Sequence, residues 1–138
     1  MIAYLESSAA LALYVDEPTS PEVRRIIRNV SELGTSTLTR LEVMRNLHRL
    51  LDEEHLAAAV DQFIEDLQSM MTASISDEVV ENAVAIAVST NIKSLDALHL
   101  SAALMLGGSG SAFVTFDRRQ AAAARSVGLR VLGINQMD

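Results

Sequence analysis

The sequence predicts a single α/β domain in which a parallel sheet of about five strands carries helices on both faces. The chain has 138 residues, the size of one ordinary domain, and 49% of them are apolar, which is enough for a full core. Only 4% are aromatic, so small aliphatic side chains must do the packing, which favours helices on a sheet over a β-sandwich. Strand-length apolar segments alternate with helical segments, as in sheets with parallel pairing. We therefore take residues 1–138 as one domain.

In the first half of the chain, the expected helices begin at recognisable capping signals. Ser7 or Ser8 can cap a helix after the first strand, and Pro21 marks the start of the next helix. Thr39 and Glu42 have the spacing of a capping box. The expected elements are a strand at 2–5, a helix ending at 14, a helix at 22–29, a strand at 34–38, a helix from 39 to about 51 and a helix at 52–67.

The second half repeats the alternation. Ser76 and Ser94 can each cap a helix, Asp117 starts another, and Gly128 ends it as the residue after the C-cap. The expected elements are a strand at 71–75, a helix from 76 to about 88, a helix from 94 that ends before Gly107, a turn at 108–111, a strand at 112–116, a helix at 117–127 and a strand at 130–134.

Composition excludes several classes of protein. The chain contains no cysteine, so it has no disulfides, thiolate zinc sites or cysteine nucleophiles. Its N-terminal apolar segment is too short to span a bilayer and has no basic region before it. We expect a cytoplasmic protein without a targeting segment or a membrane contact.

The net charge of −7 argues by itself against nucleic-acid binding, because phosphate contacts require Lys and Arg. The basic residues are nevertheless grouped, and Lys93 is the only lysine among them. Each group is either a solvated helix face or a phosphate contact. The groups lie at Arg24, Arg25 and Arg28, at Arg40, Arg45 and Arg49, and at Arg118, Arg119 and Arg125.

Four carboxylates are expected at one edge of the sheet. Glu6 and Asp117 directly follow strands, and Glu42 and Asp96 lie in the first turns of helices. Open parallel sheets bind ligands beyond the carboxyl ends of their strands, so these four side chains can gather there. Each also has a structural explanation as a cap or an exposed end. Four converging carboxylates repel one another unless cations neutralise them, and oxygen ligands in that number select Mg²⁺ or Mn²⁺.

Other chemistries have little support. His48, His55 and His99 lack metal-site spacing, and core or surface roles are expected for all three. No serine has a Gly-x-Ser-x-Gly setting, and the glycine-rich turn at 107–110 lacks the Lys-Ser/Thr ending of a phosphate-binding loop.

Four segments, in order over nearly the whole chain, resemble the signatures of PIN-domain proteins, with VapC-type toxins of bacterial toxin–antitoxin pairs the nearest match. They are YLESSAALALYVDEP, TSTLTRLEVMRNLHRL, SLDALHLSAAL and FVTFDRRQAAAARSVGL. The resemblance implies a parallel sheet of about five strands, an endoribonuclease that needs Mg²⁺ or Mn²⁺, and inhibition by a cognate antitoxin. We also expect a homodimer.

The resemblance places the catalytic, metal-binding set of acids on the four carboxylates already named. It also places hydroxyl groups beside that set at Ser7 and Thr115. The first acid of the family is normally Asp, whereas this chain has Glu6, whose extra methylene can weaken the geometry of a strict octahedral cation. Arg118 and Arg119, directly after Asp117, are the best-placed RNA contacts.

Alternatives come from other classes. A non-catalytic PIN scaffold that binds a protein fits Glu6 and the acidic charge. A phosphoacceptor receiver domain fits less well, because no acidic pair follows the first strand and no lysine precedes the last. For an antitoxin helix, we expect a groove on the early helices that is lined by Leu11, Leu13, Tyr14, Val43 and Leu47.

Overall fold

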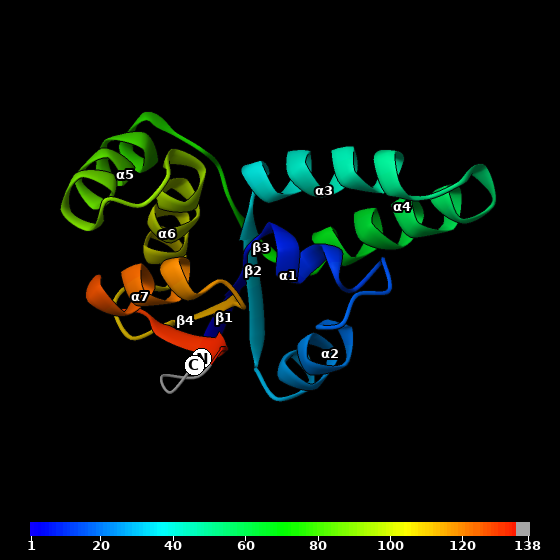
Figure 1. The fold of residues 1–138 in the computed structure, drawn as a ribbon, viewed down its shortest axis with the longest axis horizontal. Helices are drawn as coiled ribbons and strands as arrows, with labels where there is room; N and C mark the ends of the chain where they lie inside the picture. Colours follow the sequence, from blue (N-terminus) through cyan, green and yellow to red (C-terminus); the bar gives the residue numbers. More distant parts are fainter. Residues whose placement is uncertain (135–138) are drawn as a thin grey trace.

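The computed structural model describes residues 1–134, which form a five-stranded, fully parallel sheet with seven helices around it (Figure 1). The last four residues of the predicted domain, 135–138, lie outside the described part. The strands are β1 (Ile2–Leu5), β2 (Glu32–Ser36), β3 (Met71–Ala73), β4 (Ala112–Thr115) and β5 (Arg130–Gly133). The helices are α1 (Ser7–Leu11), α2 (Ser20–Arg28), α3 (Thr37–Leu50), α4 (Glu53–Gln68), α5 (Asp77–Thr90), α6 (Ser94–Gly107) and α7 (Arg118–Ser126).

Helices cover both faces of the sheet, as the sequence predicts. Successive side chains of a strand point to opposite faces, so Tyr4 of β1 joins one core while Ala3 and Leu5 join the other. The first core is shared with α5, α6 and α7, and the second with the four earlier helices, which lie on the other side of the sheet in Figure 1. Tyr4 stacks on Phe113 of the neighbouring β4 with ring centroids 5.5 Å apart, which fixes the register of the two central strands.

The expected elements are all present, but three helix N-caps and the position of one strand differ from the prediction. β2 lies two residues earlier than expected, and Ser36 rather than Thr39 is the N-cap of α3. The hydroxyl of Ser36 accepts a hydrogen bond from the Thr39 backbone N–H, so Thr39 is already inside the first turn. The predicted capping box is therefore wrong, and Glu42 lies in the second turn of the helix.

The start of α1 is capped by Glu6 and not by Ser7 or Ser8. At the start of α6, Lys93 takes the N-cap position in place of the predicted Ser94 and makes no side-chain cap. The caps predicted at Ser76 and Asp117 are confirmed.

The sheet has the strand order β3-β2-β1-β4-β5, so the chain builds outward from β1 first in one direction and then in the other. The direction changes between β1 and β4, and in open α/β sheets the crevice beyond the carboxyl ends of such a strand pair is the usual ligand site. Within residues 1–134, no helix is both long enough and apolar enough to cross a membrane.

Candidate active site

Glu6 follows β1 directly at this crevice and is almost fully buried, with 7% of its surface exposed. Its carboxylate accepts hydrogen bonds from the backbone N–H of Ala9, at 2.6 Å, and from the Ser8 hydroxyl. Burial raises the pKa of Glu6 above its ordinary value, and the two hydrogen bonds offset this only in part. Glu6 is thus a buried acid whose oxygen caps its own helix.

Glu42 reaches the same crevice from α3 and is held by two other elements. Its Oε1 accepts hydrogen bonds from the Ser7 hydroxyl at 2.5 Å and from Nε2 of His99 at 2.8 Å. The hydrogen bond from His99 is the main reason that the pKa of Glu42 lies below its ordinary value, although partial burial acts in the opposite direction. The carboxylate of Glu42 is therefore both ionised and fixed in direction.

His99 of α6 joins this carboxylate to the core. It is 3% exposed, and its Nδ1 lies 2.8 Å from the Tyr4 hydroxyl, which is itself hydrogen-bonded to Ser36 at 2.8 Å. An ionised carboxylate can only accept hydrogen bonds, so Nε2 of His99 must carry a hydrogen and donate it to Glu42. Of the core or surface roles expected for His99, the core role is correct. Its position three residues after Asp96 suggests a contact with that acid, but its hydrogen bond to Glu42 was not predicted.

Asp96 and Asp117 form the second part of the site, on α6 and at the start of α7. Burial, and then the negative charges of Asp117 and Glu42, raise the pKa of Asp96, while the charges of His99 and Lys93 act against that rise. Asp117 caps α7 by accepting the backbone N–H of Gln120 at 2.9 Å. Mutual repulsion is thus already present among three of the four predicted acids.

Gln120 connects these two acids to β4 and was also missed by the sequence reasoning. It is buried, and its side-chain amide lies 3.3 Å from Oδ1 of Asp96. The Thr115 hydroxyl donates to its Oε1 at 2.7 Å and accepts from the Asp117 backbone N–H at 3.1 Å. Thr115 therefore organises both the amide and the backbone on which Asp96 and Asp117 depend.

Two adjoining cavities open on the four acids. The α1 cavity, of about 490 Å³, is lined by Glu6, Ser7, Glu42, Lys93, Asp96 and His99 among others. The α7 cavity, of about 540 Å³, is lined by Asn91, Lys93, Asp96, Asp117 and Arg119 among others. Both share Lys93 and Asp96, so Asp96 lies between a Glu6–Glu42 side and an Asp117 side. No three of the four acids have oxygens within 4.8 Å of one another.

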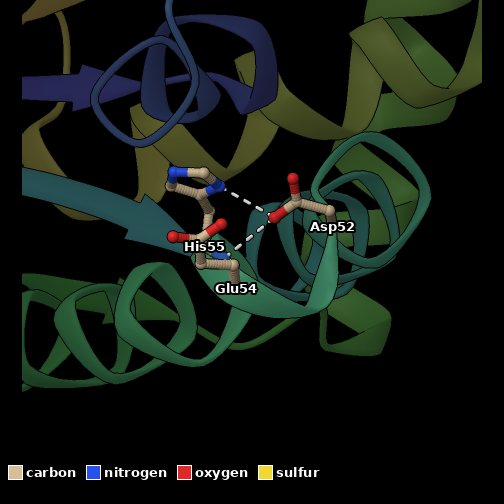
Figure 2. Close-up of side chains that lie close together, drawn as sticks. All are labelled: Asp52, Glu54 and His55. Atoms are coloured by element: carbon tan, nitrogen blue, oxygen red, sulfur yellow. Dashed lines mark hydrogen bonds and ion pairs between the residues drawn. The ribbon is translucent and has the colours of Figure 1, made fainter.

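One group of three ligand residues within residues 1–134 does meet that distance, and it lies elsewhere. It consists of Asp52, Glu54 and His55, all exposed, at the turn between α3 and α4 (Figure 2). Asp52 caps α4 by accepting the His55 backbone N–H at 3.0 Å and also accepts from the imidazole at 2.8 Å. In Figure 1 this turn is the far end of the α3–α4 hairpin, away from the sheet edge. Its contacts are those of an ordinary helix cap.

The predicted partner groove on the early helices needs a correction. Val43 and Leu47 are fully buried in the core, so they are not available to a partner helix. Leu11, Leu13 and Tyr14 remain partly exposed, and Leu11 borders the α1 cavity.

The fold and the gathered acids define a parallel α/β domain with carboxylates around the topological switch point of its sheet. Residues 3–126 match the family model described as PIN domain, and the chain belongs to the PIN-domain family. Family membership removes the receiver-domain alternative.

Known relatives are similar over most of their length. Ribonuclease VapC46 of Mycobacterium tuberculosis (strain ATCC 25618 / H37Rv) is 33% identical over 94% of this chain and 95% of its own. Ribonuclease VapC47 of Mycobacterium tuberculosis (strain CDC 1551 / Oshkosh) is 33% identical over 91% of each chain. Among solved structures, a toxin–antitoxin complex from Klebsiella pneumoniae has the same fold, with a TM-score of 0.69 and 17% identity over 87% of this chain and 90% of that one.

Proposed function

We propose that this protein is a divalent-metal-dependent endoribonuclease and the toxin of a toxin–antitoxin pair. The observation that carries the proposal is the position of Asp96. It lies at the junction of two cavities, at the switch point of the sheet, within the electrostatic reach of Glu42 and Asp117. Membership of the PIN-domain family and relatives named as ribonucleases supply the reaction class.

The donor set fits a hard divalent cation. Asp96, Asp117 and Glu42 offer only carboxylate oxygens, which Mg²⁺ and Mn²⁺ prefer. Burial is the main cause of the raised pKa of Asp96, and a cation would relieve the repulsion by Asp117 that adds to it. Glu6 fits less well, because its carboxylate is already engaged by Ser8 and Ala9. Held by these carboxylates, such a cation would supply Lewis-acid chemistry, which would polarise a phosphodiester and activate a water at neutral pH.

The protein's own residues do the positioning. Ser7 and His99 hold Glu42 towards the crevice, while Thr115, through Gln120, holds Asp96. Catalytic acids fixed by partners of this kind do not have to be reoriented during the reaction, which is the main benefit of a preorganised site. The four acids, with Ser7 and Thr115 beside them, are the proposed machinery.

A cognate antitoxin is the proposed protein partner. A chain of net charge −7 attracts basic segments, and the structural relative from Klebsiella pneumoniae is a toxin–antitoxin complex. The partly exposed side chains near the α1 cavity are the proposed contact for such a segment. Because the proposed substrate is RNA, the proposed location is the cytoplasm. The expected homodimer stays a prediction, for which the exposed apolar stripe of Val80, Val84 and Val88 on α5 offers a surface.

The second candidate function is a PIN scaffold with weak or no catalysis. The engagement of Glu6 in a helix cap favours it, because one of the four acids is then withheld from a cation. Asp caps helices as well as Glu does and is shorter, so Glu6→Asp tests whether the longer side chain limits activity.

The test is cleavage of a mixed cellular RNA pool by the intact chain with Mg²⁺, with Mn²⁺ and with chelator. Asp96→Asn should lower the cleavage rate by about 100-fold or more, because partners of metal ligands already contribute about 10- to 100-fold. The matched control is Asp52→Asn in the exposed group of Figure 2, where Asn retains the helix cap. It should leave the rate unchanged.

Wild-type cleavage that persists in chelator would refute metal dependence. If wild type and Glu6→Asp both fail to cleave RNA but bind the protein encoded beside this chain, the scaffold function is correct. Loss of cleavage in Asp52→Asn with normal cleavage by Asp96→Asn would move the site to the α3–α4 turn.

A further inference from the structure

Only two of the eleven basic residues line the cavities beside the acids. Lys93 borders both cavities, and Arg119, in the first turn of α7, borders the α7 cavity. Arg118, its neighbour in sequence, borders neither. The sequence suggests Arg118 and Arg119 equally as RNA contacts, but only Arg119 lines one of these two cavities. Lys93, to which the sequence assigns no role, lines both cavities.

Among the residues that the structure describes, neither of these two basic side chains has a polar partner that would stabilise the fold. Within residues 1–134, Lys93 and Arg119 take part in no ion pair and no side-chain hydrogen bond. Four other arginines have such partners, for example Arg25 with Glu22 and Arg125 with the Ile134 carbonyl, whereas the remaining five have none within residues 1–134 but line neither cavity. Lys93 lines the same two cavities as Asp96. In a protein of net charge −7, two unpaired cations beside a carboxylate cluster call for an anionic ligand.

The α7 cavity has the size and lining for one nucleotide. Its volume of about 540 Å³ lies within the usual range for small-molecule sites, roughly 300 to 1,000 Å³. Apart from the two cations and two acids, its polar lining is neutral, with hydroxyl and amide groups from Ser89, Thr90, Asn91 and Ser126. Groups of this kind hydrogen-bond to sugars and to base edges, and an arginine plane can stack on an unpaired base.

We propose that the α7 cavity binds a nucleotide of single-stranded RNA adjacent to the scissile phosphate, with Lys93 and Arg119 contacting the phosphates on its two sides. The assignment rests on the proposed ribonuclease function and adds the path of the substrate. A strand that leaves the α7 cavity for the α1 cavity must pass Lys93 and Asp96, the two residues that the cavities share. The phosphate to be cut is thus bracketed by a cation on one side and the acids on the other.

The experiment measures binding rather than cleavage, so that it does not depend on catalysis. A fluorescent, unstructured RNA oligonucleotide is titrated with the full chain in chelator at several salt concentrations. Each phosphate contact on a single strand contributes about 0.7 to the slope of log affinity against log salt. Lys93→Gln and Arg119→Gln should each lower the slope by about 0.7, and the double variant by about 1.4. Over a fourfold rise in salt, each lost contact corresponds to about 2.6-fold less weakening.

Arg130→Gln is the matched control. It removes the same charge at the first residue of β5, at the amino ends of the parallel strands and thus away from the carboxyl edge that holds the acids. This variant should leave the slope unchanged. Equal slopes in all variants and wild type would overturn the assignment, as would an equal fall in Arg130→Gln, which would show a general charge effect. So would a wild type that binds no RNA, or variants that lose only the affinity for the protein encoded beside this chain.

Failure here is distinguishable from failure of the proposed function. Unchanged slopes together with loss of cleavage in Asp96→Asn would refute the nucleotide site and leave the ribonuclease intact. Lowered slopes without any metal-dependent cleavage by wild type would keep the RNA site and refute the enzyme.

Discussion

Removing the hydroxyl of Tyr4 tests whether the buried hydrogen-bond network sets the direction of Glu42. Tyr4→Phe deletes two hydrogen bonds of 2.8 Å, to Ser36 and to His99, and keeps the ring that stacks on Phe113. At about 0.5 to 1.5 kcal/mol for each bond, the free energy of unfolding should fall by about 1 to 3 kcal/mol. With an unfolding entropy of about 2.1 cal/mol/K per residue, 138 residues lose about 3.5 °C per kcal/mol, so Tm should fall by about 3 to 10 °C.

The effect on cleavage follows from the same contacts. Without the Tyr4 hydroxyl, Nδ1 of His99 loses its partner, and the imidazole that donates to Glu42 is no longer held from behind. Partners that orient metal-binding side chains contribute about 10- to 100-fold to metal affinity or activity. We expect the cleavage rate of Tyr4→Phe to fall by about 10-fold, and its half-saturating Mn²⁺ concentration to rise, in assays well below its Tm.

Tyr14→Phe is the matched control. It also deletes one tyrosine hydroxyl, which donates to Asp66 of α4 at 2.7 Å in the other core. Its stability should fall by about 1.5 to 3 kcal/mol because the acceptor is charged, while the cleavage rate and the Mn²⁺ dependence stay unchanged. Equal cleavage rates for the two variants would refute a positioning role and leave the network purely structural.

The architecture was predictable because the signals that define it are local and repeated. The alternation of core faces along β1, with Tyr4 on one side and Leu5 on the other, follows from the period of two of any strand. Strands that alternate with helices typically pair in parallel, and parallel strands place the residues that follow them at one edge of the sheet. Because Glu6 follows β1 and Asp117 comes shortly after the neighbouring β4, this geometry predicts that both lie at the same edge of the sheet.

The helix starts were harder to predict because several residues could serve as the cap. Residues 35–39 contain four hydroxyl side chains, and any of them satisfies the general preference for Ser or Thr at an N-cap. The choice falls on Ser36 because it is the last residue of β2, where it pairs with Ala73 of β3, and α3 begins at the next residue. The pairing of β2 with β3 therefore determines which residue is the N-cap of α3, a choice that the local preference for Ser or Thr leaves open.

The network around Glu42 was beyond sequence reasoning because its members are distant in the chain. His99 lies 95 residues from Tyr4 and 92 from Ser7, and no local pattern connects them. Gln120 was missed for a related reason: a glutamine three residues after Asp117 reads as part of a helix cap. Only the packing of α6 and α7 against β4 brings its amide to Asp96.

Two further predictions concern stability. Gly133→Ala should cost more than about 3 kcal/mol in chemical denaturation, because its φ is +111° and an added Cβ would lie 2.4 Å from the Thr115 carbonyl oxygen. Gly110→Ala, at φ +88° with nothing within 4 Å, should cost only about 1 kcal/mol, and equal costs would contradict the steric reasoning. The other prediction concerns Glu6, whose raised pKa, caused mainly by burial, means that the folded state holds a proton that the unfolded state has already released. Stability from this group is therefore present at acidic pH and is lost as pH rises through the raised pKa. Glu6→Gln stays neutral at every pH and keeps an oxygen to accept the Ala9 backbone N–H. In urea denaturation with chelator, the variant should gain stability relative to wild type as pH rises above 4.5, the ordinary value of the glutamate pKa. A difference that stays constant from acidic to neutral pH would mean that Glu6 is ionised in both states, and that its buried carboxylate is stabilised by the helix cap alone.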